Sequence, residues 1–143
     1  MEKQSIYTPY SDLIRSIGMN IRNMANARLS ELGLNTQQGQ MMGYIFENQD
    51  KGVIQRDLAE HFGRKGATIT SMLQGLEKKG YVKRVIPKDN ERQKKIYLLQ
   101  KGIDLVEEFN DIFMGVERRI TQGLTESESV TLMELLNKVK KTM

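Results

Sequence analysis

The sequence predicts a mainly α fold with a small β-hairpin wing, that is, a winged helix-turn-helix unit flanked by amphipathic helices. Apolar residues recur at helical spacing in six segments, which predicts six helices. Two runs rich in β-branched and aromatic residues, 81–86 and 95–99, are separated by a charged turn, which predicts a hairpin. Proline occurs only twice in 143 residues, as expected of a chain dominated by helices.

Length and charge predict one domain with a polyanionic partner. A chain of 143 residues is long enough to bury a sizeable core, and we expect residues 1–143 to form a single domain. The segment 53–102 holds twelve Lys and Arg against five Asp and Glu, a net charge of +7, whereas the remainder carries −3. Positive charge gathered on one structural unit, with this order of elements, indicates DNA.

Residue counts narrow the chemistry. The chain has no cysteine, which excludes disulfides and cysteine-based zinc sites, and His61 is its only histidine. No nucleophile–histidine–acid set is present, and residues 63–68 lack the spacing of a phosphate-binding P-loop. We therefore expect no enzyme activity, metal or cofactor. No apolar run approaches the roughly 20 residues of a membrane span, so we expect a cytoplasmic protein.

The first third of the chain predicts two helices. Ser11 is a plausible N-cap for the first, and Gly33 is a natural stop. The apolar stripe of this helix comprises Leu13, Ile17, Ile21 and Met24. Asn35 or Thr36 then caps a second helix, whose apolar residues are Met41, Met42, Ile45 and Phe46.

The middle of the chain predicts two helices joined by a tight turn, followed by the hairpin. A short helix runs from Gln55 to Phe62, a turn occupies 63–65, and a second helix spans about 66–79. The second helix has an apolar stripe at positions i, i+3, i+4 and i+7, namely Ile69, Met72, Leu73 and Leu76. Two helices joined by a short glycine-containing turn form a helix-turn-helix, whose second helix can lie in a major groove.

The last third predicts two more helices. A long helix is expected after Gly102, with its apolar side formed by Ile103, Val106, Phe109, Phe113, Val116, Ile120 and Leu124. Thr125 and Glu128 fit a capping box, which starts a final helix. That helix is predicted to bury Leu132, Met133, Leu136 and Val139.

The buried stripe of the 66–79 helix determines which side chains face outward. Small or hydrogen-bonding residues occupy the opposite face, and they suit close approach to base edges: Ala67, Thr68, Thr70, Ser71 and Gln74. Arg64 and Lys65 lie at the helix entry, where backbone N–H groups also favour phosphate. An ordinary solvated helix face would have a similar composition.

The turn of the hairpin is the second candidate DNA contact. It carries a cluster of basic residues that no core requires: Lys88, Arg92, Lys94 and Lys95. A basic loop beside a helix-turn-helix can reach into the minor groove, where narrow A·T-rich stretches favour arginine. A solvated charged turn is the alternative, and the neighbouring helix-turn-helix favours DNA.

Several motifs resemble the winged-helix core of the MarR family of transcriptional regulators. They are Leu58-Ala59-Glu60, Thr68-Ile69-Thr70, the block Leu76 to Arg84, and Ile96-Tyr97-Leu98 through Lys101-Gly102. The turn Arg64-Lys65-Gly66-Ala67-Thr68 is similar to that of the multidrug-efflux repressors of this family. The resemblance implies a DNA-binding lobe at 36–99 and dimerisation helices at 10–33 and 101–143. It also implies a homodimer, a pseudo-palindromic operator, and repression relieved by small aromatic or cationic ligands in many members.

The chain departs from the family pattern at a few positions. Arg92 matches the wing arginine that enters the minor groove, but Asn90 occupies the position where the family has an aspartate. Asparagine can still hydrogen-bond a guanidinium, although without the charge, and the neighbouring Asp89 is the alternative partner for Arg92. Ile54, Lys65 and Leu99 replace the usual capping residues of three helices, at about 1 kcal/mol each.

The resemblance further implies a ligand cavity between the dimerisation helices and the DNA-binding lobe, for a small apolar or aromatic effector. The candidate lining residues are Met19, Arg22, Met41, Tyr44, Phe109 and Phe113. Methionine is adaptable and suits apolar ligands, although core packing would also account for most of these residues.

Together these features predict a sequence-specific DNA-binding transcriptional regulator, a ligand-responsive repressor that binds double-stranded DNA as a homodimer. The alternative is a winged-helix interaction module that binds protein or RNA without operator recognition. The basic helix face and wing favour the first hypothesis.

Overall fold

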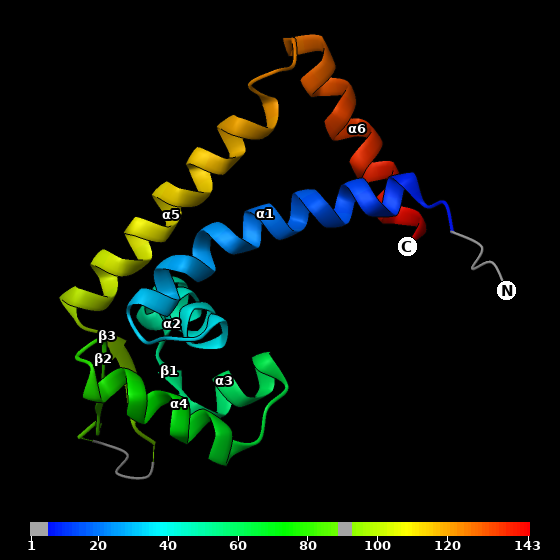
Figure 1. The fold of residues 1–143 in the computed structure, drawn as a ribbon. Coiled ribbons are helices and arrows are strands. Elements are labelled where there is room, and N and C mark those ends of the chain that lie inside the picture. The colour runs from blue at the N-terminus through cyan, green and yellow to red at the C-terminus, as the bar shows by residue number, and fades with distance from the viewer. Residues whose placement is uncertain (1–5, 89–92) are drawn as a thin grey trace, which may run out of the picture.

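The computed structural model describes residues 6–88 and 93–143, and over these residues the fold is mainly helical with a small sheet, as predicted (Figure 1). The helices are α1 (Pro9–Glu31), α2 (Thr36–Asn48), α3 (Gln55–Phe62), α4 (Gly66–Lys78), α5 (Gln100–Thr121) and α6 (Glu126–Thr142). A single 3-10 turn, η1 (Gln49–Lys51), follows α2, and the strands are β1 (Val53–Ile54), β2 (Val82–Val85) and β3 (Lys95–Leu98).

The wing is an antiparallel sheet in the order β1-β3-β2. Ile96 of β3 pairs with Val53 of β1 on one side and with Arg84 of β2 on the other. The sequence did not predict β1, because two residues are too few to show an alternating pattern. Gln49 extends the connection to α2, since its side-chain oxygen accepts a 3.0 Å hydrogen bond from the backbone N–H of Leu98.

Most of the core of the chain lies in the winged lobe, which comprises α2, α3, α4 and the sheet. Its fully buried side chains come from α2, α3, α4 and the sheet, namely Met41, Met42, Ile45, Val53, Leu58, Ile69, Leu73, Leu76 and Ile96. Burial of each aliphatic side chain stabilises the fold by about 1.5–3 kcal/mol. This core therefore fixes the orientation of α4 within the lobe.

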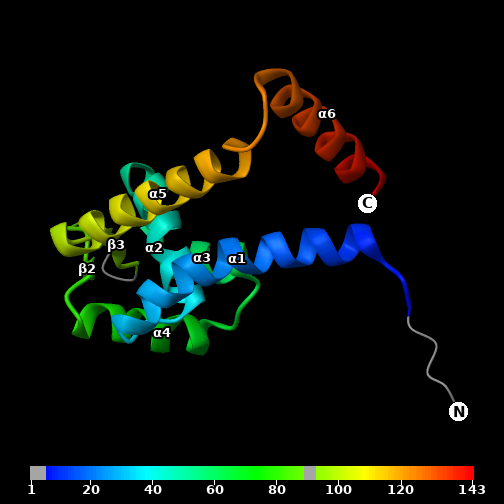
Figure 2. The same ribbon diagram turned by 45° about the horizontal axis from the view of Figure 1, so that its top comes forward.

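The long helices α1 and α5 leave the winged lobe, and α6 turns back from the far end of α5 (Figures 1 and 2). They do not close into a bundle within one chain. Apolar side chains predicted to be buried are consequently exposed, including Ile17 at 51% and Leu136 at 49%. Over the described residues, no helix has the length and apolar character needed to cross a membrane.

Two helix starts differ from the sequence prediction. The first helix begins at Pro9 rather than after Ser11, because proline tolerates the first helical turn, where its missing N–H is not needed. The long helix α5 begins at Gln100, so Gly102 lies inside its first turn. There a Cβ atom would collide with the carbonyl oxygen of Tyr81, so Gly102 allows close packing and does not precede the helix.

Two predicted caps are confirmed. The Asn35 side chain accepts a 2.8 Å hydrogen bond from the N–H of Gln38, whose side chain accepts one from the N–H of Asn35. Thr125 and Glu128 make the same reciprocal pair at the start of α6. The N–H of Ile54, which cannot cap through its own side chain, is bound by the Asp57 carboxylate at 2.9 Å.

Candidate nucleic-acid interface

The turn between α3 and α4 forms the helix-turn-helix. Gly63 has a φ of 59°, the left-handed conformation that glycine adopts readily, and it ends α3. The N–H of Arg64 donates to the carbonyl of Ala59 at 3.0 Å, which closes the turn. The chain then enters α4 after two residues, with Ile69, Leu73 and Leu76 fully buried.

The opposite face of α4 is the one that the sequence predicted for DNA. Thr68, Ser71 and Gln74 are exposed, together with the small residue Ala67. Thr70 is half-buried instead, because it lies at the edge where α4 meets the start of α3. The outward surface is therefore narrower than the helical pattern alone predicted.

Gln55 fixes the start of α4 against α3. Its side-chain amide donates to the carbonyl of Gly66 at 3.0 Å and to the hydroxyl of Thr70. The Thr70 hydroxyl in turn donates to the same carbonyl at 2.9 Å. The sequence analysis missed Gln55, and its only signal was a polar side chain at the first position of a short helix.

The beginning of α4 is suited to an anion. Arg64 and Lys65 are both exposed, and no side chain among the described residues caps the helix. Backbone N–H groups at an uncapped helix start carry partial positive charge and can donate to phosphate. Two exposed cations beside such a helix start form a local site for an anion.

The described part of the wing adds further positive charge. Lys88, Lys94 and Lys95 are exposed, whereas Asn90 and Arg92 lie outside the described residues. A hollow of about 380 Å³ separates the wing from the start of α3, lined by Ile54, Gln55, Arg56, Arg84, Gln93 and Lys94. Arg56, which the sequence analysis did not select, thus adds an exposed cation between helix and wing.

An ion pair connects the wing to the end of α4. Arg84 of β2 contacts the carboxylate of Glu77, and both side chains are less than one-third exposed. Because its charge is matched inside the protein, Arg84 serves to hold the wing and contributes little to DNA attraction.

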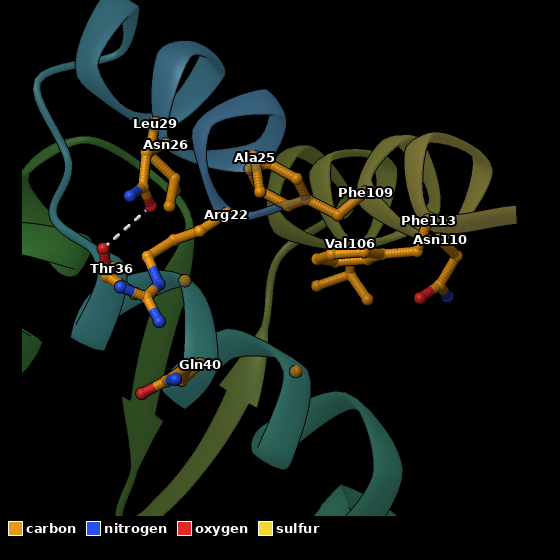
Figure 3. Close-up of a pocket in the computed structure, with 12 residues that line it drawn as sticks. Arg22, Ala25, Asn26, Leu29, Thr36, Gln40, Val106, Phe109, Asn110 and Phe113 are labelled. Carbon is orange, nitrogen blue, oxygen red and sulfur yellow. Dashed lines mark hydrogen bonds between the residues drawn. The ribbon is translucent and has the colours of Figure 1, made fainter. Parts of the chain in front are cut away.

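A second hollow, of about 370 Å³, lies between α1, α2 and α5 (Figure 3). It is lined by Arg22, Ala25, Asn26, Leu29, Thr36, Gly39, Gln40, Gly43, Val106, Phe109, Asn110 and Phe113. Three of the predicted ligand residues, Arg22, Phe109 and Phe113, therefore come together. The hydroxyl of Thr36 donates to the Asn26 side chain at 2.9 Å across the α1–α2 side of the hollow.

The other three predicted ligand residues do not line this hollow. Met19 is half-exposed on α1, and Met41 is 1% exposed in the core. Tyr44 faces another part of the lobe, where its ring lies 4.4 Å from that of His61 and 6.1 Å from that of Phe62. Helical spacing did not distinguish these faces, because α2 contacts other elements on several sides.

An ion pair between Arg28 and Glu108 joins α1 to α5 beside the hollow, and Arg28 also contacts Glu31 within α1. Arg28 donates to Glu108 at 2.9 Å and to Glu31 at 3.2 Å. Its hydrogen bonds to Glu108 and then Glu31 raise the pKa of the Arg28 guanidinium above its ordinary value. Arg28 is thus the ion-pair partner of both Glu108 and Glu31. Residues 6–88 and 93–143 contain no cluster of three or more metal-binding side chains.

A helix-turn-helix with an exposed polar helix face and a basic β-wing defines a class, the winged-helix DNA-binding proteins. Residues 24–109 match a family model described as the transcriptional regulator SarA/Rot. The chain is 33% identical to the HTH-type transcriptional regulator SarZ of Staphylococcus epidermidis over 106 residues, which cover 74% of this chain and 69% of that protein.

Solved structures with a similar fold are also transcriptional regulators. A protein from Clostridium acetobutylicum assigned to the MarR family of transcriptional regulators is 62% identical, with a TM-score of 0.81, covering 96% of this chain and 100% of that one. Staphylococcus aureus MepR in complex with DNA is 32% identical, with a TM-score of 0.83, covering 93% and 98%. MepR has also been solved with ethidium bromide, with a TM-score of 0.75. The chain belongs to the MarR family of winged-helix regulators and is a DNA-binding transcriptional regulator.

Proposed function

We propose that the chain is a repressor that binds a pseudo-palindromic operator as a homodimer, with one α4 in each of two successive major grooves. The observation that carries the proposal is the face of α4 that presents Thr68, Ser71 and Gln74 beside an uncapped basic helix start. Small polar side chains suit base edges, and exposed N–H groups suit phosphate. The solved MepR–DNA complex, at 32% identity, supports this reading.

The proposed DNA contacts are of two kinds, contacts to base edges and contacts to phosphates. We assign base-edge contacts to Thr68, Ser71 and Gln74, and we assign phosphate contacts to the exposed cations Arg64, Lys65, Lys88 and Lys94. Thr70 supports the helix start, because its hydroxyl is bound to Gly66 and Gln55. Arg92 remains a proposed minor-groove contact, with Asn90 as its support.

Dimerisation would cover the apolar faces of the long helices. Exposed apolar side chains run along the first half of α1 and along α6, including Leu13 at 64% and Leu136. Contiguous apolar surface of this kind marks a protein interface. We therefore assign 10–33 and 101–143 to dimerisation and 36–99 to DNA binding. A two-fold axis would place the recognition helices about 34–36 Å apart, one turn of DNA.

The hollow between α1, α2 and α5 is the proposed site of a small effector. It lies where the long helices join the winged lobe, so a ligand there can favour one angle between them. Such a ligand relieves repression if it binds more tightly to the conformation whose recognition helices are wrongly spaced for DNA. In this proposal the chain is a cytoplasmic protein without enzyme activity.

The proposal is tested by titrating the full chain with duplex DNA. Duplexes selected from a random pool, followed by fluorescence anisotropy, should yield a two-fold symmetric site bound more tightly than random duplex. Raising the salt from about 50 to about 200 mM should weaken binding by about a thousandfold if about six phosphates are contacted. Salt-insensitive binding, or tighter binding to RNA or a protein, would favour the alternative interaction module.

A pair of variants separates base contacts from phosphate contacts. Ser71→Ala should weaken binding to the selected site by roughly 1–3 kcal/mol while leaving random duplex nearly unchanged. Lys88→Ala should weaken both by a similar factor and lower the salt slope by about one. Equal effects of the two variants on selected and random DNA would contradict the assigned roles.

A further inference from the structure

We infer that Lys79 and Lys101 are positioning residues for DNA binding, because they connect the C-terminal end of the recognition helix α4 to the long helices α1 and α5. In the homodimer proposed above, on which this inference rests, the two lysines thereby hold the recognition helices at the spacing of the operator half-sites. Both side chains are exposed, and neither is among the residues assigned to base edges or phosphates.

Lys79 connects the end of α4 to the end of α1. It is the C-cap of α4, and its ammonium donates to the carbonyl of Leu32, the C-cap of α1, at 3.2 Å. The last carbonyls of a helix lack partners within the helix and lie at the negative end of its dipole, so a cation there makes a charge-assisted hydrogen bond. Gly33 leaves room for this approach, since a Cβ atom on it would lie 2.7 Å from the Lys79 nitrogen.

Lys101 connects the same end of α4 to α5. Its ammonium donates to the carbonyl of Lys79 at 2.7 Å and lies 4.5 Å from the centre of the buried Tyr81 ring. A cation in the first turn of α5 opposes the dipole of that helix, so its own helix does not stabilise it. The favourable interactions of Lys101 are therefore those that it makes with the end of α4 and with Tyr81.

The two lysines form one continuous series of contacts. Leu32 of α1 accepts from Lys79, whose carbonyl accepts from Lys101 of α5, so one residue at the end of α4 joins both long helices. Elsewhere α1 and α5 pack chiefly on α2 and on each other rather than on α4. The orientation of α4 relative to the long helices therefore depends on this junction.

The first test compares operator spacings by fluorescence anisotropy with the full chain. The selected duplex is compared with versions that have one base pair more or one fewer at the centre, which changes the half-site separation by about 3.4 Å. The unaltered chain should bind the selected duplex at least about tenfold more tightly than either version. The double variant Lys79→Met with Lys101→Met should reduce this ratio to within about threefold.

The ratio of affinities isolates positioning from charge. Removing a lysine weakens its general attraction to phosphate, but that loss is nearly the same for duplexes of nearly the same charge. The loss therefore cancels in the ratio. Because both side chains are exposed, the double variant also leaves the buried core of the lobe intact.

Two further variants serve as controls. Lys78→Met removes the neighbouring exposed cation, which takes part in neither contact, and it should keep the ratio of the unaltered chain. Lys101→Arg should retain most of the ratio, since a guanidinium can also donate to a carbonyl and stack on an aromatic ring. A ratio that the double variant leaves unchanged, or that Lys78→Met lowers equally, would overturn the role of the two lysines.

A second measurement, made without DNA, separates this inference from the proposed function. The chain has no cysteine, so Ala67→Cys at the exposed start of α4 and Asp111→Cys on α5 can each carry a spin label. Labelled chains are diluted with unlabelled ones, and double electron–electron resonance then measures the distance between the two labels within one chain. The double Met variant should broaden the distance distribution by about twofold, whereas Lys78→Met should not.

The two measurements have distinct outcomes. A distribution that stays as narrow in the double variant as in the unaltered chain would overturn the inference, whatever DNA the protein binds. A broadened distribution in a chain that selects no two-fold symmetric site would support the role of the lysines at the junction and contradict the proposed operator.

Discussion

The winged lobe and the three long helices satisfy their apolar residues in different ways. In the lobe, Leu58, Ile69 and Leu73 are completely buried by neighbouring elements of the same chain. Along α1 and α6, Leu13 and Leu136 remain about half-exposed or more although their spacing is equally regular. A helical stripe therefore predicts an apolar face, but it does not establish whether the same chain covers that face.

The difference also separates two sources of stability. The lobe is stabilised by burial within one chain, which is independent of protein concentration. If a second chain covers the long helices, their contribution depends on concentration through mass action. Variants in the two regions should therefore respond differently to dilution.

The largest effect is expected from a charge placed on the exposed face of α6. Leu136→Glu should prevent dimerisation, because an unpaired carboxylate would have to be buried in an apolar interface. Without a dimer only one α4 can engage each operator, and the affinity should fall by about a hundredfold or more. Sedimentation velocity and anisotropy measure the two consequences.

Lys138 supplies the matched control for this variant. It lies two residues from Leu136, about 200° around the helix, so Lys138→Glu changes charge on the polar side of α6. That control should remain dimeric. A Leu136→Glu protein that sediments as the wild type does would show that α6 has no part in assembly.

The next largest effect is expected in the core of the lobe. Leu73→Ala should lower the free energy of unfolding by about 2–5 kcal/mol, because it removes a completely buried side chain and leaves a cavity. The loss should be the same at low and high protein concentration, whereas that of Leu136→Ala should change with concentration. Denaturant unfolding curves at two protein concentrations provide the comparison. A stability loss for Leu73→Ala that changed with protein concentration would contradict the distinction between the two regions.

The smallest effect on stability is expected at the start of α4. Gln55→Ala removes two hydrogen bonds, to Gly66 and Thr70, and should cost about 1 kcal/mol. Its effect on operator affinity should exceed that of Gln100→Ala, which removes a 2.8 Å bond to Asp104 within α5 and does not touch the start of α4. Equal affinities of the two variants would exclude a positioning role for Gln55.

The sequence predicted the elements that depend on local patterns. The stripe of Ile69, Leu73 and Leu76 determined the orientation of α4, and capping residues located the starts of α2 and α6. It did not predict that Thr70 is half-buried, because that depends on a contact with Gln55, fifteen residues away. The role of Gly102 likewise depends on the close approach of the Tyr81 backbone carbonyl, which is distant in the sequence.

The candidate ligand site was only partly predictable for a similar reason. Arg22, Phe109 and Phe113, which the resemblance suggested, line the hollow because they lie on the faces by which α1 and α5 approach α2. Met41 and Tyr44 share α2 with lining residues but project from other faces, one into the core and one toward His61. Assigning them needed the rotation of α2 within the lobe, which three-dimensional packing determines.

The close approach of Gly102 to Tyr81 has a mechanical consequence. The C-terminal end of α4 is joined there to α5, through the Lys101 side chain to the Lys79 carbonyl at 2.7 Å and the Leu99 N–H to the Tyr81 carbonyl at 2.9 Å. Because Gln55 holds the other end of α4 against α3, a rotation of the lobe about this junction would move the recognition helix as a unit, and its 13 residues span about 20 Å. Such a rotation by about 10° would displace the start of the helix, near Thr68, by about 3.5 Å, roughly one base-pair step of DNA.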